Sequence, residues 1–304
     1  MSKGLHRFAV LVACATFFLI IAGANVTSHD AGLATSDWPL SYGQFFPKMV
    51  GNLFWEHGHR QVAMSVGLLT IALVIYLQIR ERRTWVKRLG WIALGGVIAQ
   101  SLLGGLTVKM NLPLAVSAAH ATLAQLFFLT TVSLAIFTSR SWMTPASTVS
   151  VNGEGVSIRA LCVGALAVIL TQLVLGATLR HSATWDQPLP TGLLLAHIGG
   201  AVIVTLVLGF TVLTVLMRHR GEKYLARPAF VAIVLLVVQL LLGLAAYITR
   251  SASPSDPQPL NPMIAVTVAH VACGALVFAA TIVLTLRVFK VLRVSRQEYV
   301  LAPA

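Results

Sequence analysis

The sequence predicts an all-α membrane protein with eight transmembrane helices, built as two parallel-repeated four-helix bundles related by a pseudo-two-fold axis along the membrane normal. Three observations lead to this fold. Hydrophobic residues make up 57% of the 304 residues, and charged residues only 10%. Apolar runs of about 20 residues, the length that crosses a bilayer, recur along the chain. The second half repeats motifs of the first half, as duplicated units do.

We expect the eight spans at residues 8–26, 56–79, 88–108, 115–138, 158–179, 191–217, 227–249 and 262–286. The first carries a short basic head without a cleavage site, which favours a retained helix over a removed signal peptide. Most connections are short, but segment 139–157 is rich in Ser, Thr and Gly and is typical of a linker. We therefore expect two domains, one bundle at residues 1–145 and a second at residues 146–304.

The formal net charge of +13 follows from membrane topology and requires no nucleic-acid partner. Seventeen Lys and Arg residues fall on one side of the predicted spans and five on the other. The side with more positive charge, which includes both termini, is expected to be cytoplasmic. The sequence thus predicts a multi-pass protein of the cell (inner) membrane, in contact with lipids.

The internal repeat is clearest between the third and fourth spans and the seventh and eighth. Near the end of the third span, AQSLLGGLTVK ends at Lys109, and SAAHATLAQLFF follows in the fourth span. Near the end of the seventh span, VQLLLGLAAYITR ends at Arg250, and TVAHVACGALVF follows in the eighth span. The other spans match less strongly, AGANVTSHDAG with LGATLRHSATW and EHGHRQVAMSVGLL with LLAHIGGAVIVTLV. Because four spans return the chain to its starting side, the two copies must have parallel topology.

Four of the nine histidines occupy matching places, in the outer third of each even-numbered span: His59, His120, His197 and His270. The repeat aligns His59 with His197, and His120 with His270. His57 lies about 200° around the helix from His59, so the two cannot both face the interior, and the repeat selects His59. The remaining four, His6, His29, His181 and His219, fall in loops or basic segments, where we expect contact with solvent or lipid headgroups.

Two imidazoles that face each other across a four-helix bundle suit axial ligation of a heme iron. The sequence therefore predicts two heme sites, His59 with His120 and His197 with His270. Small residues beside these histidines would make room for a porphyrin. A zinc or copper site would need a third ligand, and none recurs in both halves.

The two predicted sites are not equivalent. Glu56 precedes His59 by one helical turn, whereas Leu194 stands at the equivalent place before His197. A carboxylate there would stabilise developing positive charge or accept a proton. We therefore expect chemistry in the first half and a cofactor heme in the second. The alternative interpretation is that Glu56 only stabilises the helix start or pairs with Arg60.

These residues resemble the heme A synthase family over nearly the whole chain. The matching features are GANVTSHDAGLATSDWPLSYG after the first span, the E-x-x-H-R of WEHGHR, one histidine in each even span and the duplicated plan. The resemblance implies oxidation of the C8 methyl of heme O to a formyl group, giving heme A for terminal oxidases, with a bound heme b. It also implies the heme O synthase (a prenyltransferase), terminal-oxidase assembly factors and an unidentified electron acceptor as partners.

The family's functional residues fall on identifiable positions of this chain. The resemblance implies that Glu56 is the catalytic carboxylate and that His59 and His120, with Arg60, bind the substrate heme. It implies that His197 and His270 hold heme b as axial ligands of the iron.

This chain departs from the family pattern at a few places. Many members have a cysteine pair in the first outer loop, where this sequence has Ala34 and Ser41. Its three cysteines, Cys14, Cys162 and Cys273, lie within predicted spans and cannot form a disulfide in that loop. A thiol-dependent step there is excluded. Ile198 replaces an arginine that follows the third histidine in some relatives.

Three other functions compete with heme A synthesis. The alternative is a bis-His b-type membrane cytochrome that only transfers electrons, although such a carrier does not require Glu56. A prenyltransferase would need aspartate-rich diphosphate motifs, and no D-x-x-x-D occurs. A transporter would leave the four matched histidines unexplained.

Overall fold

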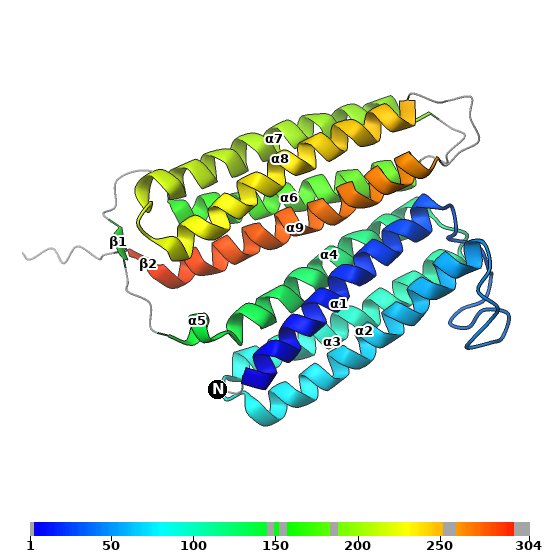
Figure 1. The fold of residues 1–304 in the computed structure, drawn as a ribbon, viewed down its shortest axis with the longest axis horizontal. Coiled ribbons are helices and arrows are strands. Elements are labelled where there is room, and N and C mark those ends of the chain that lie inside the picture. Colours follow the sequence, from blue (N-terminus) through cyan, green and yellow to red (C-terminus); the bar gives the residue numbers. More distant parts are fainter. Residues whose placement is uncertain (1–2, 145–148, 152–156, 183–187, 252–259, 295–304) are drawn as a thin grey trace, which may run out of the picture.

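The computed structural model describes residues 3–144, 149–151, 157–182, 188–251 and 260–294. Its long helices lie side by side and run the length of the molecule (Figure 1). Within the described residues, eight helices are long and apolar enough to cross a membrane. They are α1 (Lys3–Ser28), α2 (Asn52–Arg80), α3 (Thr84–Lys109), α4 (Leu114–Phe137), α6 (Ile158–His181), α7 (Thr191–Arg218), α8 (Lys223–Ser251) and α9 (Asn261–Val291).

The prediction of an all-helical protein with eight spans is confirmed. Most helices extend beyond the predicted apolar runs by a few residues, because a helix continues into polar residues that can lie in the headgroup region. The helix that we expected at 227–249, for example, is Lys223–Ser251. Pro228 lies inside its first two turns, where it removes few helical hydrogen bonds.

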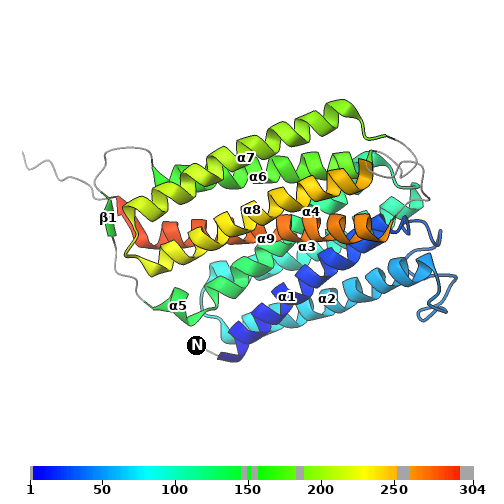
Figure 2. The ribbon, with the colours of Figure 1, turned by 45° about the horizontal axis from the view of Figure 1, so that its top comes forward.

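The helices of each half pack in the same cyclic order. In the first half α1 packs on α2, α2 on α3, α3 on α4 and α4 on α1; in the second half α6, α7, α8 and α9 make the corresponding four contacts. The halves meet where α9 packs on α1 and α4, and where α4 packs on α6 (Figures 1 and 2). Helices α2 and α3 therefore lie on one outer side of the molecule, and α7 and α8 on the other.

Each half has its own apolar core, and a third cluster joins them. The first-half core includes Leu5, Val66 and Leu134, and the second-half core includes Leu208 and Leu284. Ile20 of α1 and Phe128 of α4 pack with Ala275 and Ala279 of α9 in the joining cluster. The third cluster is formed by α1, α4 and α9, so these three helices hold the halves together.

Large apolar side chains also cover the outer surface. On α2, Leu68, Ile71, Ile75 and Ile79 are 44–69% exposed, and α7 and α8 expose similar rows. In water such a surface would drive aggregation, whereas in a bilayer it contacts lipid tails. The protein is a multi-pass membrane protein.

The predicted linker contains short elements that hydropathy did not predict. Helix α5 (Arg140–Met143) begins after Ser139, whose side chain accepts a hydrogen bond from the backbone N–H of Trp142 at 3.2 Å. Strand β1 (Val149–Val151) pairs in parallel with strand β2 (Leu292–Val294). Lys290 of α9 also donates to the backbone oxygens of Ser141 and Thr144. The linker is thus fastened to the end of α9.

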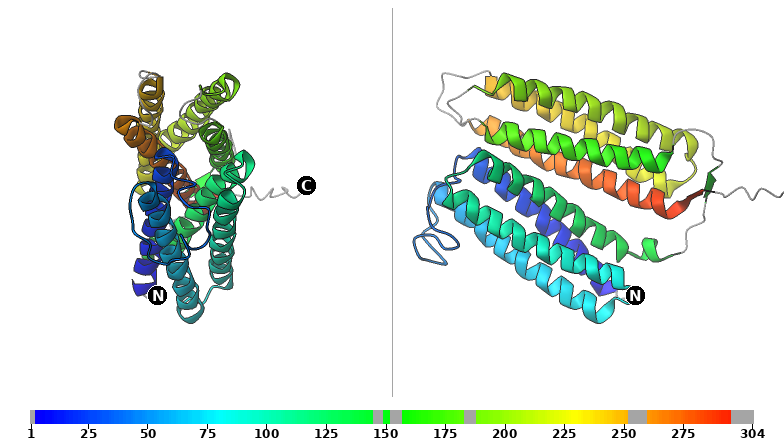
Figure 3. Two further views of the ribbon diagram at one scale, coloured as in Figure 1. Left: turned by 90° about the vertical axis from the view of Figure 1, so that its right-hand side faces the viewer. Right: turned by 180° about the vertical axis from the view of Figure 1, so that it is seen from behind.

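The loop of residues 29–51 lies over the end of the first bundle that is remote from the N-terminus (Figure 3). Gly105 of α3 allows this close approach, because a Cβ there would lie 2.6 Å from the Trp38 ring. Lys109 also donates to the backbone oxygen of Ser36 at 3.1 Å. The loop therefore covers the end of the first bundle at which the histidine-bearing helices begin.

Candidate active site

Each of the four predicted ligand histidines comes from a different helix. His59 lies on α2, His120 on α4, His197 on α7 and His270 on α9. Each belongs to the first third of its helix, and these helices all begin at the end of the bundle remote from the N-terminus (Figure 1). The expectation that the four histidines share one depth is therefore confirmed.

His197 and His270 face each other across the second bundle. Their ring centroids are 6.4 Å apart, and the ring planes are inclined by 77°. With metal–imidazole bonds of about 2 Å, two rings on opposite sides of one metal ion have centres roughly 6 Å apart. The spacing of this pair therefore fits axial ligation of a single iron.

His59 and His120 line one large cavity inside the first bundle. The cavity has a volume of about 510 Å³ and is bounded by α1, α2, α3, α4 and the loop of residues 29–51. Glu56 and Arg60 also line it, and Trp38 and its neighbours in the loop form its cover. The structure thus brings together in one cavity all four residues that the sequence predicts for the substrate site.

Each ligand histidine packs against a glycine on the helix that precedes its own. The histidine Cε1 would lie about 3 Å from a Cβ at that glycine in every case: His59 with Gly23 (3.1 Å), His120 with Gly104 (3.0 Å), His197 with Gly176 (3.0 Å) and His270 with Gly243 (2.9 Å). A side chain larger than hydrogen would displace the ring. The room for the rings therefore comes from the neighbouring helix rather than from small residues beside the histidines.

The sequence contained a signal for these glycines that we did not use. Three of them end a Gln-x-x-x-Gly motif, at Gln100, Gln172 and Gln239, and the side chain of each glutamine lies beside the corresponding histidine. A comparison of the odd-numbered spans with one another would have revealed this Gln-x-x-x-Gly motif.

Glu56 and Arg60 form an ion pair within one turn of α2, between Oε1 of Glu56 and Nη2 of Arg60. Oε2 of Glu56 accepts a hydrogen bond from the backbone N–H of Thr35 at 2.9 Å. The Arg60 Nη1 donates to the backbone oxygens of Asp37 and Leu40, both at 2.7 Å. The pairing that we considered as an alternative to catalysis is therefore present, and the paired carboxylate still faces the cavity.

The side chain of His57 hydrogen-bonds to the loop and does not occupy the centre of the cavity. Its Nε2–H donates to the backbone oxygen of Phe45 at 2.9 Å. Because a carbonyl only accepts, Nδ1 is the acceptor nitrogen and receives the hydroxyl of Ser41 at 2.8 Å. Ser41 is fully buried and also accepts from Arg60. Both ring nitrogens of His57 are thus engaged, so His57 has a structural role.

The expectation that the other four histidines contact solvent or lipid headgroups was wrong for His219, which is buried, whereas His6, His29 and His181 are partly exposed. His181 ends α6 and lines the first-half cavity, although its position near a loop suggested exposure. His29 stacks on Trp55 with ring centroids 3.8 Å apart. His219 is buried, and Nδ1 of His6 lies 3.0 Å from the backbone oxygen of Ala135. Hydropathy identifies the end of a span but does not show what packs over it.

Two polar residues of α4 belong to the cavity and were also missed. Ser117 and Gln125 line it, and the Ser117 Oγ and Gln125 Oε1 atoms are buried without a hydrogen-bond partner among the described residues. An unpaired polar atom in an apolar bundle is costly unless a ligand or water binds it. These atoms therefore fit a cavity that receives a ligand with polar groups.

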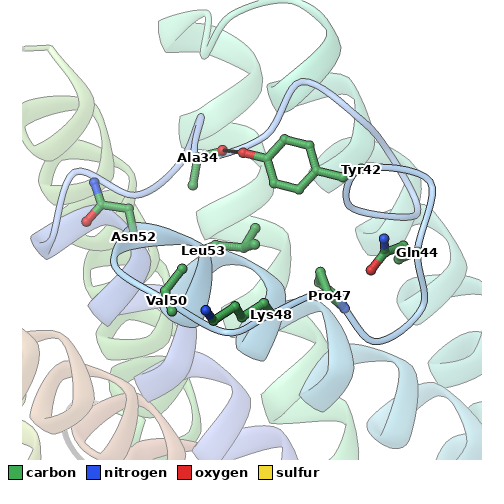
Figure 4. A pocket seen from close by; sticks show the side chains of 8 residues that line it. All are labelled: Ala34, Tyr42, Gln44, Pro47, Lys48, Val50, Asn52 and Leu53. Carbon is green, nitrogen blue, oxygen red and sulfur yellow. Dashed lines mark hydrogen bonds between the residues drawn. The ribbon is translucent and has the colours of Figure 1, made fainter.

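A second hollow of about 490 Å³ lies on the outer loop itself and is distinct from the histidine cavity. Figure 4 shows that Tyr42 and Leu53 lie on its wall, with the Tyr42 hydroxyl donating to the backbone oxygen of Ala34 at 3.1 Å. None of its lining residues is a histidine or a carboxylate. We therefore assign the candidate chemistry to the cavity beneath the loop.

Within the part of the chain that the structure describes, no group of three or more His, Cys, Asp or Glu side chains is arranged to hold a metal ion. The three cysteines are free thiols, with Cys162 and Cys273 buried and Cys14 exposed.

The chain is similar to proteins of one family. The family model described as cytochrome oxidase assembly protein (COX15-CtaA) matches residues 49–185. The heme A synthase of Symbiobacterium thermophilum is 28% identical over 263 residues, which cover 79% of this chain and 85% of that protein. The heme A synthase of Shouchella clausii is 28% identical over 270 residues, covering 83% of this chain and 90% of that protein.

Proposed function

We propose that the chain is a member of the heme A synthase family, an oxidoreductase that converts heme O to heme A by oxidising the C8 methyl group to a formyl group. One observation supports this assignment above the others. Glu56 and His59 lie one turn apart on α2 and line the same cavity, whereas the second half has Leu194 where the first has Glu56.

We propose that the chain is a duplication, with the substrate site at residues 1–145 and the cofactor site at residues 146–304. The identical cyclic packing of helices in the two halves supports this proposal, as does the reciprocal contact of α1 with α9 and α4 with α6. Both are expected of a pseudo-two-fold axis along the bundle. The excess of Lys and Arg at the end that holds the N-terminus supports a cytoplasmic location of that end.

In the second half, His197 and His270 would hold heme b. The residues fit this group, because the 6.4 Å ring separation suits one iron and because the absence of a side chain at Gly176 and Gly243 makes room for the two rings themselves. A bound heme b would accept and pass on the electrons that the reaction removes. The final acceptor, the heme O synthase and terminal-oxidase assembly factors remain proposed partners.

In the first half, His59 and His120 would bind the iron of the substrate heme O. Oxidation of a methyl carbon makes that carbon electron-poor and releases protons. The Glu56 carboxylate, held by Arg60 and Thr35 in a site covered by the loop, would stabilise the positive charge or accept a proton. Trp38 and the loop line the cavity and would limit its contact with water, which would strengthen that electrostatic interaction.

The test is to extract and separate hemes from cells that express the protein with and without a supply of heme O. We expect heme A only when heme O is supplied. Glu56→Gln should keep heme b and fold normally but reduce conversion by about two to four orders of magnitude, the range for losing an acid–base group.

Leu194→Gln is the matched control, because it introduces the same amide at the equivalent place of the second half and should convert heme O like the wild type. Wild-type conversion by Glu56→Gln would reduce Glu56 to a partner of Arg60. Bound heme b without any heme A would instead support the electron-carrying cytochrome.

A further inference from the structure

Three of the four ligand histidines have a glutamine amide beside them. Nε2 of Gln172 lies 3.1 Å from Nδ1 of His197 and donates to the His197 backbone oxygen at 2.8 Å. Nε2 of Gln100 lies 3.4 Å from Nε2 of His120 and donates to the His120 backbone oxygen at 3.0 Å. Each amide thus contacts both the imidazole and the backbone of its partner histidine.

The third glutamine completes the pattern. Nε2 of Gln239 lies 3.4 Å from Nε2 of His270. Each glutamine precedes the glycine beneath the same histidine by four residues, so amide and glycine lie on one face of the neighbouring helix. One helix face therefore supplies both the space for the ring and a hydrogen-bonding group beside it.

In the second half the glutamines are also confined from the opposite side. A Cβ at Gly200 would lie 2.1 Å from Oε1 of Gln172, and a Cβ at Gly274 would lie 3.2 Å from Nε2 of Gln239. Both glycines lie on the histidine-bearing helix, one turn after the ligand. Each amide is thus held between a ligand histidine and a glycine.

The polar atoms at these sites that have no hydrogen-bond partner indicate the role of the amides. Oε1 of all three glutamines is buried without a partner among the described residues, as is Nδ1 of His120 and of His270. A histidine that binds a metal through one nitrogen carries an N–H on the other, and this N–H normally needs an acceptor. The unpartnered Oε1 of each glutamine is an acceptor that can receive such an N–H when the histidine ring turns to bind iron.

His59 differs from the other three. The residue four positions before its glycine, Gly23, is Leu19, which has no polar group in its side chain. Nδ1 of His59 is buried without a hydrogen-bond partner in the described part of the chain, as are those of His120 and His270, so the difference lies in the missing amide alone. His59 is packed by the same kind of glycine contact but lacks the amide.

We infer that Gln100, Gln172 and Gln239 are positioning residues that orient His120, His197 and His270 toward iron, and that His59, with Leu19 in place of the glutamine, is the ligand that releases its heme. This inference rests on the proposed function. Heme b must stay bound through many turnovers, and both of its ligands have an amide. A substrate heme must leave after each turnover, and one of its two ligands is not restrained.

The first test uses purified full-length protein loaded with heme b. Gln172→Met and Gln239→Met keep the side-chain volume but remove the amide. We expect about 10- to 100-fold weaker retention of heme b, the usual effect of losing a group that supports a metal ligand. We also expect an altered electron paramagnetic resonance spectrum of the ferric heme and a shifted midpoint potential, which a purely structural role would not produce.

Gln78→Met is the matched control, because Gln78 lies near the other end of α2 and should leave the heme b spectrum unchanged. Unchanged spectra and potentials in both Gln172→Met and Gln239→Met would overturn the inference and leave the proposed function intact. A wild-type protein that binds no heme at all would overturn both.

The second test adds or removes an amide in the first half. Leu19→Gln should increase the heme O and heme A that copurify and slow turnover, whereas Leu19→Met, of similar size but without an amide, should match the wild type. Gln100→Met should lower heme O retention about 10- to 100-fold without changing the heme b spectrum. Equal retention by Leu19→Gln and Leu19→Met, or wild-type retention by Gln100→Met, would overturn the assignment.

Discussion

In the second half of the molecule, two histidines face each other at 6.4 Å with a glutamine beside each ring. In the first half, the equivalent histidines line a cavity of about 510 Å³ that a loop covers and that contains the Glu56–Arg60 ion pair. The helices pack in the same order in both halves. The comparison supports the proposal that one scaffold serves two purposes, since a rigidly held pair of histidines would suit a retained cofactor, and a roomy, charged cavity would suit a substrate.

The largest expected difference between the halves is in heme retention. His197→Ala or His270→Ala should lose heme b almost completely, because one imidazole cannot replace the pair. His59→Ala should keep most of its heme b and make no heme A. Pyridine hemochrome spectra of the purified variants measure the first effect, and chromatography of extracted hemes measures the second. Equal loss of heme b from all three variants would contradict the division of labour between the halves.

The next largest effect should come from Arg60, which has no counterpart in the second half. Arg60→Gln would leave the buried Glu56 carboxylate unpaired and release two loop carbonyls, at a cost of about 3 kcal/mol. We expect a lower thermal midpoint in detergent and loss of heme A formation. Ile198→Ala changes the equivalent, half-exposed position and should alter stability by less than about 0.5 kcal/mol. Similar stability of the two variants would show that the ion pair does not hold the loop.

A moderate effect is expected from the glycines that accommodate the rings. Gly176→Ala would place a Cβ 3.0 Å from Cε1 of His197 and force the ring to move. Heme b retention should fall about tenfold, the lower end of the range for disturbing a ligand's support. Gly209→Ala on α7 is the control, because no atom lies within 4 Å of its Cβ. Heme titration of the apoprotein compares the two, and equal affinities would mean that the ring contact has no role in binding.

The smallest effects concern the helix turns at the end of the molecule that holds the N-terminus. Hydrogen bonds from Arg83 lower the pKa of Glu81 to about 2, so its stabilising effect is complete above its usual pKa of 4.5 and is lost as pH falls toward 2. Because this pair lies near the surface, we expect about 1 kcal/mol. In the second half, burial lowers the pKa of His219 below 6.5, so stability declines already as pH falls below 6.5.

Thermal midpoints measured against pH separate these two groups. Glu81→Gln should flatten the curve only below about pH 4.5. His219→Gln should remove the decline that begins near pH 6.5. A single transition that neither variant changes would mean that other groups determine the acid sensitivity of both halves.

The sequence by itself determined the eight spans, the four matched histidines and the presence of a carboxylate, Glu56, beside the histidine in only one of the two halves. Length and hydropathy are sufficient for a span, because no other short structure satisfies its backbone hydrogen bonds in lipid. A repeat of four spans is sufficient to align His59 with His197 and His120 with His270. These features depend on the local pattern and period of residue types, which can be read directly from the sequence.

Only the tertiary structure decided which side chains surround those histidines. His57 bonds to Ser41 and Phe45 because of the way the loop of residues 29–51 lies over the first bundle. His181 lies at the cavity because of the way α6 packs against that bundle. The contact between His59 and Gly23 joins residues 36 positions apart on two helices. Helix rotation and crossing are set by the packing of many side chains at once, so no single stretch of sequence encodes them.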